Sequence, residues 1–288
     1  MRLDQKIAEM ARRLADEGIE TARLDARLLA SHGLSLSETD IILQFDRSLD
    51  ADEMALLDAF IARRAEREPI AHILGYREFW GLDFKVTKDT LVPRPDSETL
   101  VAGVLDRIAD KRAPLKLVDI GTGTGCLLLS LLSELPNARG VGSDISPAAL
   151  AVAQENAQSL GLSGRVAFVE ASYADAFAGG MDILISNPPY LAETEMADIE
   201  RDVADYDPLG ALVSGATGLE AYEAIFAAIA SWQQKPSLMA FEFGYRQAAA
   251  VKSLAQVHGL AEENDTHCHI LQDLGGQNRI LLLETHPI

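Results

Sequence analysis

The feature that most constrains the fold is the alternation of apolar runs with helical patterns that begins at Leu115. Seven short runs are typical of strands, because each is largely apolar and is bounded by glycine, proline or polar residues. They cover residues 115–120, 140–145, 166–169, 181–186, 238–243, 267–271 and 279–284. Helical patterns lie between them at 126–135, after Ser146-Pro147, at 219–232 and at 247–258. The alternation predicts an α/β fold: a doubly wound, mostly parallel seven-stranded sheet that binds ligands beyond the carboxyl ends of its strands.

The residues before this sheet predict a separate helical region. Apolar residues recur at steps of three and four over residues 3–14, and Gly18 and Gly33 end the first two helices. Ser37 is placed to cap a third helix, and Asp50 with Glu53 forms a capping box for a fourth. We expect a small all-helical domain over residues 1–68, a β-hairpin linker over 69–95 and an α/β domain over 96–288.

Two features are recognisable in the linker and at the start of the α/β domain. Residues 79–86 predict two short strands around Gly81. The helix that follows is expected to begin at a cap provided by Asp96. Its inner face would carry Leu100, Val101, Val104, Leu105 and Ile108.

Charge and cysteine content limit the class of function. The net charge is −19, with 12 Lys and Arg against 17 Asp and Glu up to Lys85, and 13 against 27 after it. Such a surface repels phosphate backbones and complements a basic protein partner, although it also serves solubility alone. Cys126 and Cys268 have no spacing typical of a disulfide framework or a zinc site, which favours a reducing cytoplasm. No apolar run reaches the roughly 18 residues of a transmembrane helix, and the amphipathic start contains acids unlike a signal peptide.

Two motifs at strand ends indicate a cofactor. The turn Gly121-Thr122-Gly123-Thr124-Gly125 follows the strand 115–120, and its glycines permit close approach of a ligand to backbone N–H groups. Position 126 is Cys, so the motif is GxGxG and not the dinucleotide pattern GxGxxG. Asp144 ends the next strand, where a carboxylate accepts hydrogen bonds from ribose hydroxyls or, alternatively, caps its own helix. Together they predict an adenosine-containing cofactor.

A third motif, Ser186-Asn187-Pro188-Pro189-Tyr190, follows the strand 181–186. The two prolines have a fixed φ and no N–H, and they keep bare carbonyl groups in an extended path. Asn187 both donates and accepts, and Tyr190 adds a flat ring with a hydroxyl. An acceptor-rich notch with a planar wall suits a substrate with a planar NH₂ group, although Asn-Pro also begins ordinary turns.

Taken in this order, the glycine turn, the ribose carboxylate and Asn-Pro-Pro-Tyr resemble a class I S-adenosylmethionine-dependent methyltransferase. From about residue 68 to residue 283 the chain is similar to the bacterial peptide chain release factor N5-glutamine methyltransferases, the HemK/PrmC family. The stretches that carry the resemblance are 77–80, 92–98, 119–125, 187–190, 202–203 with 211–212, and 242–244 with Gln247. The resemblance implies that the chain methylates the side-chain amide nitrogen of the glutamine in the GGQ motif of release factors. S-adenosyl-L-methionine would be the donor, S-adenosyl-L-homocysteine the product, and the helical domain the part that contacts the release factor.

The same resemblance implies the roles of individual residues. The cofactor would be bound by Gly121, Thr122, Gly123, Thr124, Gly125, Asp144, Tyr173 and Asn187. The substrate amide would be bound by Asn187, Pro188, Pro189 and Tyr190. We expect the Asn187 side-chain oxygen and the Pro188 carbonyl to accept the two amide hydrogens while Tyr190 packs against the amide plane. Asn187, Pro188 and Tyr190 are thus the expected catalytic residues, and no metal is expected.

Two positions depart from the family pattern. At Ser172 the family more often has Asp near the adenine, and a hydroxyl accepts less strongly than a carboxylate; Tyr173 can still stack on the ring. At Asp207 the family usually has Glu. Two other sequence features are expected to be structural: Gly275-Gly276-Gln277 should form a turn, and Cys126 should pack in the core.

Two other functions fit parts of the pattern. One is a DNA or RNA adenine or cytosine amino-methyltransferase, because nucleobase amines fit the same notch. The other is a non-catalytic binding module that has kept the fold. We expect a monomeric enzyme with no membrane association and no direct nucleic-acid contact.

Overall fold

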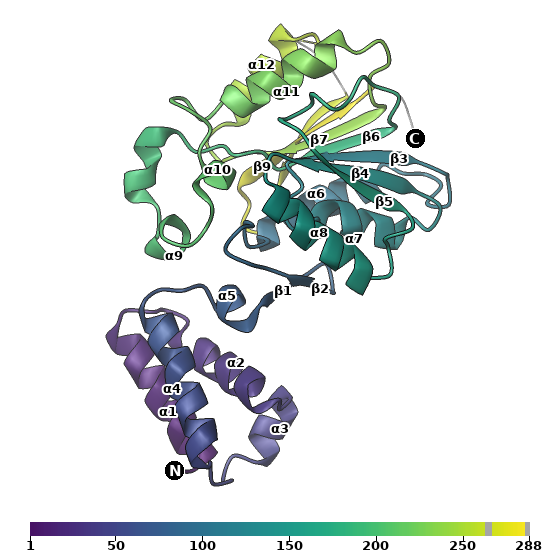
Figure 1. The fold of residues 1–288 in the computed structure, drawn as a ribbon. Helices are drawn as coiled ribbons and strands as arrows, with labels where there is room; N and C mark the ends of the chain where they lie inside the picture. Colours follow the sequence, from purple (N-terminus) through teal and green to yellow (C-terminus); the bar gives the residue numbers. More distant parts are fainter. Residues whose placement is uncertain (263–266, 286–288) are drawn as a thin grey trace. The chain divides into compact units, whose positions relative to one another are not determined.

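The computed structural model describes residues 1–262 and 267–285. Its internal contacts divide the chain into two compact units (Figure 1). The first, which we call the helical unit, consists of Met1–Tyr76 and Glu200–Tyr206. The second, the sheet unit, consists of Arg77–Ile199 and Asp207–Ile288.

The helical unit begins with the four helices that the sequence predicts. These are α1 (Leu3–Asp16), α2 (Ala22–Leu34), α3 (Glu38–Leu43) and α4 (Ala51–Ala65). The Ser37 hydroxyl accepts from the Asp40 N–H at 3.1 Å, and the Asp50 carboxylate accepts from the Glu53 N–H at 2.9 Å, so both predicted caps are confirmed. The pattern does not predict α5 (Ile70–Leu74), because five residues are too few to display a helical period.

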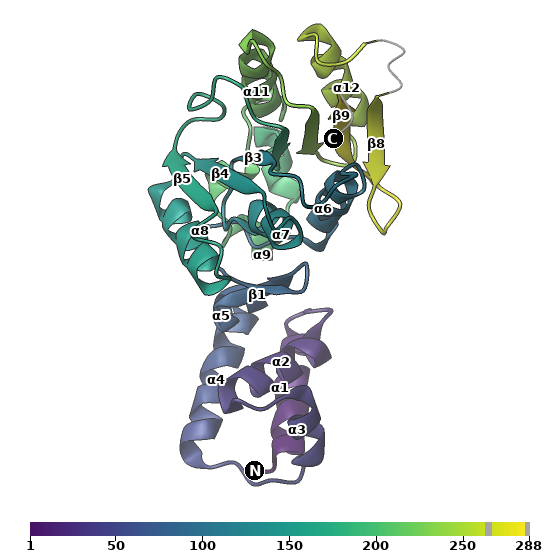
Figure 2. The same ribbon diagram turned by 90° about the vertical axis from the view of Figure 1, so that its right-hand side faces the viewer.

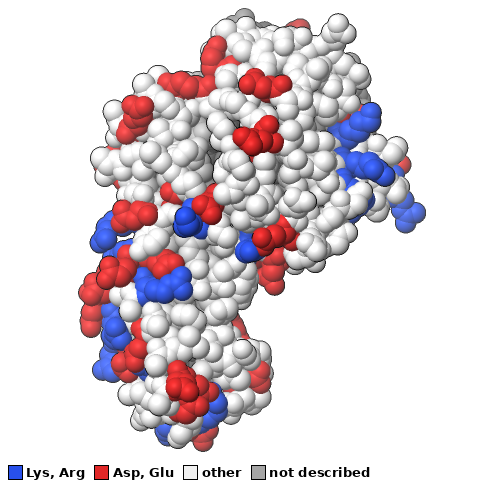
Figure 3. All heavy atoms as spheres, in the orientation of Figure 1, with Lys and Arg blue, Asp and Glu red and all other residues white. Residues whose placement is uncertain are grey.

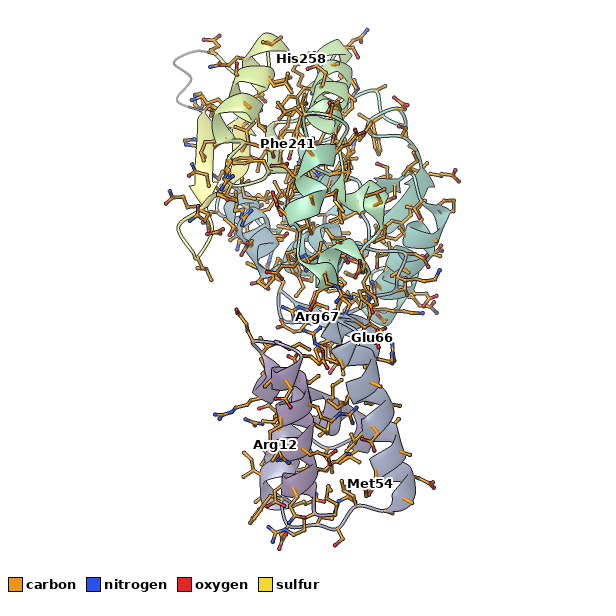
Figure 4. The ribbon with its side chains drawn as sticks, turned by 90° about the vertical axis from the view of Figure 1, so that its left-hand side faces the viewer. Arg12, Met54, Glu66, Arg67, Phe241 and His258 are labelled. Carbon is orange, nitrogen blue, oxygen red and sulfur yellow. The ribbon has the colours of Figure 1, made fainter. Side chains whose placement is uncertain are left out.

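A segment that is distant in sequence from residues 1–76 completes the helical unit. It is residues 200–206, with the short helix α9 (Arg201–Ala204). Arg64 is buried and forms ion pairs with Asp25 and with Asp202, both at 2.7 Å. The Tyr206 hydroxyl donates to the carbonyl of Glu66 at 2.9 Å, at the end of α4 where Figure 4 labels Glu66. These contacts fix α9 to α4.

The sheet unit confirms the predicted α/β class. Its strands are β3 (Lys116–Ile120), β4 (Arg139–Asp144), β5 (Val166–Glu170), β6 (Ile183–Ser186), β7 (Leu238–Glu242), β8 (Cys268–Gln272) and β9 (Asn278–Glu284). They form one seven-stranded sheet in the order β5-β4-β3-β6-β7-β9-β8. All neighbours from β5 to β7 pair in parallel, and β9 runs antiparallel to β7 and β8. The predicted hairpin is also present, as β1 (Tyr76–Phe79) and β2 (Leu82–Lys85).

Alternate residues of each central strand pack on opposite faces of the sheet. Leu117 and Ile183 belong to the core on one face, and their neighbours Val118 and Leu184 belong to the core on the other. The first core is completed by α6 (Glu98–Leu105), α7 (Cys126–Glu134) and α8 (Pro147–Ser159), and the second by α11 (Glu220–Ser231) and α12 (Ala248–Val257), as Figure 2 shows. Phe241, labelled in Figure 4, lies in the second core, where its ring stacks edge-on against Phe226. Two covered faces explain why these strands are continuously apolar.

The expected role of Asp96 is wrong. A single 3₁₀ turn, η1 (Pro95–Ser97), precedes α6, and the residue at the cap position is Ser97, whose side chain makes no capping bond. Asp96 instead forms an ion pair with Arg279 at 3.0 Å. The pairing partner lies on a distant strand, so local sequence gives no sign of it. The predicted inner face of α6 is confirmed, since all five of its residues are buried.

A long segment joins β6 to α11. Residues 191–219 contain the 3₁₀ segment η2 (Glu193–Asp198) and α10 (Leu209–Leu212) as well as α9. Gly275-Gly276-Gln277 lies in the turn between β8 and β9, as expected, with the Gly276 N–H donating to the Asp273 carbonyl at 2.9 Å. Cys126 packs against the first core, and burial raises the pKa of its thiol to about 12, so its expected structural role is confirmed.

Candidate active site

Parallel pairing brings the predicted motifs to one edge of the sheet. Ile120, the last residue of β3, pairs with Ser143 of β4 and with Ser186 of β6. Ser186 in turn pairs with Phe241 of β7. The glycine turn, Asp144, Asn187 and Glu242 therefore follow or end four adjacent strands at their carboxyl ends, where open α/β sheets bind ligands.

The glycine turn is open on its outer side. Gly121, Gly123 and Gly125 have φ values of 73°, 54° and 81°, a left-handed conformation that disfavours other residues. A Cβ atom built at Gly121 or Gly123 would meet nothing within 4 Å. These two glycines are therefore required by the backbone path and leave space for a ligand.

The threonines of the turn support it from the inside. Thr122 is buried, and its hydroxyl donates to the Asp119 carboxylate at 2.6 Å. Thr124 is also buried; its hydroxyl accepts from the Cys126 N–H at 3.4 Å, and its carbonyl accepts from the Asn156 side chain at 2.9 Å. Both side chains thus hold the turn in shape.

Asp144 joins the turn to the end of β4. One carboxylate oxygen accepts from the Gly123 N–H at 2.9 Å and the other from the Ser146 N–H at 2.9 Å. The side chain of Ser146 caps α8 by accepting from the Ala149 N–H at 3.2 Å, which confirms the predicted cap. Each Asp144 oxygen has a second lone pair, so the residue can still accept from a ligand.

Asp119 is a second carboxylate under the turn. It is completely buried, and its Oδ1 atom has no hydrogen-bond partner in the described part of the chain. Burial raises the pKa of Asp119 to about 7, the Thr122 hydrogen bond opposes the shift, and the charge of Asp144 adds to it. Asp119 and Asp144 together place acidic groups at this part of the edge, which favours a ligand that carries positive charge.

Tyr173 lies in the loop after β5 and has a φ of 47°. A left-handed conformation is strained for a tyrosine and is concentrated at functional sites. The Ser143 hydroxyl contacts the Tyr173 carbonyl at 3.5 Å, which ties the loop to the end of β4. Ser172, the first departure from the family pattern, precedes it and is partly buried.

Asn187 directly follows β6 and meets two side chains from other elements. Its side-chain NH₂ donates to the Ser97 hydroxyl at 3.4 Å. Both side chains also lie close to the carboxylate of Glu242, which ends β7 and is 2% exposed. Burial raises the pKa of Glu242 to about 7, and the two nearby side chains oppose the shift.

The Asn-Pro-Pro-Tyr loop is held from the opposite side by Gln247. Its side-chain NH₂ donates to the Tyr190 carbonyl at 2.8 Å and to the Gly218 carbonyl at 3.3 Å. A Cβ atom at Gly218 would lie 2.4 Å from the Tyr190 carbonyl oxygen, so only glycine fits there. Pro188 is buried, Pro189 is partly buried, and burial raises the pKa of Tyr190 to about 12, so its hydroxyl stays protonated at neutral pH.

Asp207, the second departure from the family pattern, has defined contacts. Its carboxylate is buried, pairs with Arg94 and accepts from the Val92 N–H at 3.4 Å. The shorter side chain therefore still joins the loop after α9 to the segment that leads into α6.

Four residues of this edge are absent from the expected site: Ser97, Asp119, Glu242 and Gln247. Asp119 and Glu242 carry a sequence signal, because each is a lone acid in an otherwise apolar strand. Burying a charge is costly, so such a position favours a functional role. Ser97 and Gln247 are not acids, and their only sequence signal is that they lie in stretches that carry the family resemblance; their partners are set by the fold.

Within residues 1–262 and 267–285, no group of three or more His, Cys, Asp or Glu side chains could hold a metal ion. In the same residues, no helix has both the length and the apolar character required to cross a membrane.

Comparisons with known proteins assign the family. Residues 5–75 match the family model described as PrmC N-terminal domain, and residues 98–204 match the methyltransferase small domain. A release factor glutamine methyltransferase from Rhodospirillum rubrum is 43% identical over 94% of this chain and 81% of its own length. Another, from Cereibacter sphaeroides, is 38% identical over 98% of both chains.

Solved structures share the fold at lower identity. The catalytic domain of hMettl16, determined in complex with a MAT2A 3'UTR hairpin, superposes with a TM-score of 0.61 over 79% of this chain and 82% of that one. The N-terminal domain of human METTL16 in complex with SAH gives a TM-score of 0.53 over 80% and 84%. Both are 17% identical to this chain and show the fold alone. The relatives at higher identity decide the assignment, and the chain belongs to the release factor glutamine methyltransferases, a family of methyltransferase enzymes.

Proposed function

We propose that the enzyme methylates the side-chain amide nitrogen, N5, of the glutamine in the GGQ motif of a peptide chain release factor. The observation that carries the proposal is the position of Asn187 and Pro188. They follow β6, next to the strand that leads into the glycine turn, so the notch for a planar amide and the open turn share one edge. Family membership supplies the choice of glutamine over other planar amides.

S-adenosyl-L-methionine is the proposed cofactor, and it supplies a methyl group on a positively charged sulfur, leaving S-adenosyl-L-homocysteine. The backbone of Gly121–Gly125, the carboxylate of Asp144 and the ring of Tyr173 would hold it. The fit rests on the open side of Gly121 and Gly123 and on the acidic groups of Asp119 and Asp144 beside the turn.

The notch residues have to orient a weak nucleophile. The lone pair of an amide nitrogen is delocalised into its carbonyl, so the nitrogen reacts only when it is held in line with the methyl group. The Asn187 side-chain oxygen and the Pro188 carbonyl accept the two amide hydrogens, and Pro189 and Tyr190 flank the amide plane. Fixed orientation of this kind is worth about 7–11 kcal/mol. No strong base is needed before transfer, because the nitrogen becomes acidic once it is alkylated.

The helical unit is the proposed binding site for the body of the release factor, with residues 1–68 as the recognition domain. An apolar cavity of about 780 Å³ opens on it, lined by Ile7, Ala8, Ala11, Ile41, Ile42 and Phe45. Ile42 and Phe45 are exposed, and the charged residues of the lining are Asp4, Arg12, Arg23 and Arg27. Figure 4 labels Arg12 on α1, and Figure 3 shows that many basic side chains of this unit lie next to acidic ones. In the described part of the chain Arg12 and Arg23 have no ion-pair partner, which suits an apolar protein surface bordered by acids.

One experiment tests the function. The enzyme is incubated with radiolabelled S-adenosylmethionine and either an intact release factor or a variant with Asn in place of the GGQ glutamine. We expect label on the intact protein alone, and mass spectrometry should place one methyl group on that glutamine. Label on duplex DNA or on RNA, but not on the release factor, would show an amino-methyltransferase of nucleic acids. We also propose a monomer in the cytoplasm, which sedimentation and cell fractionation check.

A further inference from the structure

We propose that Glu242 is a positioning residue, which determines that the Asn187 amide presents its oxygen, and not its nitrogen, to the substrate. The proposal rests on the proposed function, because it assigns a cause to the acceptor role of Asn187. Glu242 ends β7, the neighbour of β6, so its side chain and that of Asn187 leave the sheet from adjacent strands. The Asn187 side chain lies close enough to the Glu242 carboxylate to favour its charged form, which opposes the rise in pKa that burial causes.

An asparagine amide has two nearly isosteric ends, one that accepts and one that donates. If the donating end faced the substrate, it would meet another NH₂ group, and no hydrogen bond would form. Something in the protein therefore has to fix the orientation. An ionised carboxylate can only accept, so it requires the NH₂ end of Asn187 to face it.

Ser97 completes the arrangement. Its hydroxyl accepts from the Asn187 NH₂ at 3.4 Å and lies close enough to the Glu242 carboxylate to favour the charged form of that group. A hydroxyl has one hydrogen, so when it donates to Glu242 its lone pairs remain for Asn187. Both N–H groups of Asn187 then have acceptors inside the protein, and its oxygen is left for a ligand.

The burial of Glu242 is costly and is only partly compensated. Its Oε2 atom has no hydrogen-bond partner in residues 1–262 and 267–285. Buried polar atoms are usually paired, and an acid kept at such a cost favours a functional role over a structural one. The Tyr222 hydroxyl donates to the backbone carbonyl of Glu242 at 2.6 Å, so the residue is also held firmly through its main chain.

The charge state of Glu242 determines whether it can act in this way. Once protonated, the carboxyl group becomes a donor and no longer requires the NH₂ end of Asn187. Burial raises its pKa to about 7, so the orientation should be lost as the pH falls below neutrality. The charged and titratable groups that influence it are Arg279 on β9, Asp96 in η1, Tyr190, Tyr222 on α11 and Cys126 on α7.

Kinetics of Glu242→Gln test the proposal. Gln keeps the shape, but its amide accepts and donates, so Asn187 is free to turn. We expect kcat on the release factor to fall about tenfold or more, with KM for S-adenosylmethionine within about twofold. The wild-type kcat should rise with pH through about 7, and the variant should lose that rise. Its melting temperature at pH 8 should be unchanged or higher, because a buried charge is removed, whereas a merely structural residue would lower it.

Glu284→Gln is the matched control. Glu284 is a carboxylate on β9 that pairs with Arg107 at 3.1 Å, away from the notch, and its variant should keep the wild-type kcat and pH profile. An unchanged kcat and pH profile in Glu242→Gln would overturn the proposal.

A second measurement needs no substrate. The chain has five asparagines, so ¹⁵N labelling of asparagine gives few side-chain NH₂ signals, and Asn187→Ala identifies the relevant pair. We expect the Asn187 signals to titrate with a midpoint near pH 7 in the wild type and not in Glu242→Gln. Signals that titrate alike in both proteins would contradict the proposal. If the wild-type enzyme did not methylate release factors, the proposed function would be refuted, but the titration of the Asn187 signals would still test the role of Glu242.

Discussion

The two halves of the active-site edge are built by different means. The glycine turn after β3 is a backbone structure, in which three left-handed glycines define the path and threonine side chains brace it from within. The notch after β6 is a side-chain structure, in which Asn187 depends on Ser97, Glu242 and, through the Tyr190 carbonyl, Gln247. A rigid backbone turn suits a cofactor that binds in one fixed shape. Recognition of one orientation of an amide instead requires side chains that distinguish a hydrogen-bond donor from an acceptor. Each half also contains one buried acid, Asp119 or Glu242.

The largest expected effect is on stability and concerns Asp119, the buried acid of the turn. Its pKa is raised from 3.8 to about 7, so the folded state is favoured when the group is protonated. This contribution is complete below about pH 4 and is lost as the pH rises through about 7, at 1.36 kcal/mol per pKa unit and roughly 4 kcal/mol in total. Asp119→Asn should therefore unfold at higher denaturant than the wild type at pH 8 and equally at pH 4. Equal stability at pH 8 would mean that the buried charge is compensated.

The next effect concerns the notch. Asn187→Ala removes the acceptor for one amide hydrogen, and we expect kcat to fall by about 10², or about 2.7 kcal/mol, as when one stabilising hydrogen bond is lost in an active site. KM for S-adenosylmethionine should change little if the residue acts mainly on the substrate. Asn137→Ala, at an exposed position where the side chain bonds only to the Arg112 carbonyl among the described residues, is the control and should keep full activity. A retained kcat in Asn187→Ala would remove the basis for the notch.

A smaller effect should separate the turn from the notch. Gly123→Ala puts a methyl group into the open side of the turn, so KM for S-adenosylmethionine should rise about tenfold, near 1.4 kcal/mol, with kcat within about twofold. Gly161→Ala has a similar left-handed φ, 71°, and equally open space at the end of α8. It should show the same conformational cost of about 1–2 kcal/mol in unfolding but no change in KM. If both variants bind the cofactor normally, the open side of the turn is not the cofactor site.

The smallest expected effect concerns Gln247, which holds the Tyr190 carbonyl from outside the notch. Its loss removes one hydrogen bond to the loop, worth about 1 kcal/mol, so Gln247→Ala should lower kcat about fivefold. Gln256→Ala, which changes a partly buried glutamine on α12 whose side chain bonds to the Glu262 carbonyl, should have no effect. A fall in kcat as large as that of Asn187→Ala would show that the Asn-Pro-Pro-Tyr loop has no other support. The glycine turn and the notch would then differ less than we infer.

The sequence predicts local structure well where a residue acts on its neighbours in the chain. The caps at Ser37, Asp50 and Ser146 are confirmed, because a cap depends on the next three residues. The expected cap at Asp96 fails for the opposite reason, since its partner Arg279 lies on the last strand. The same limit applies to the candidate active site. Its motifs could be found by their spacing, but the hydrogen bonds that Ser97 and Gln247 make with Asn187 and Tyr190 form only because the fold brings distant segments together.

The grouping of residues 200–206 with α4 has a consequence for recombination. The chain passes between the two units at 76/77, 199/200 and 206/207, so neither unit is a single continuous piece of sequence. A chimera that exchanges only residues 1–76 between relatives would pair Arg64 of one parent with the Asp202 position of the other. To exchange the helical unit between relatives, during evolution or in the laboratory, residues 1–76 and 200–206 must therefore be replaced together. A substitution at Arg64 should be accompanied by a compensating substitution at Asp202.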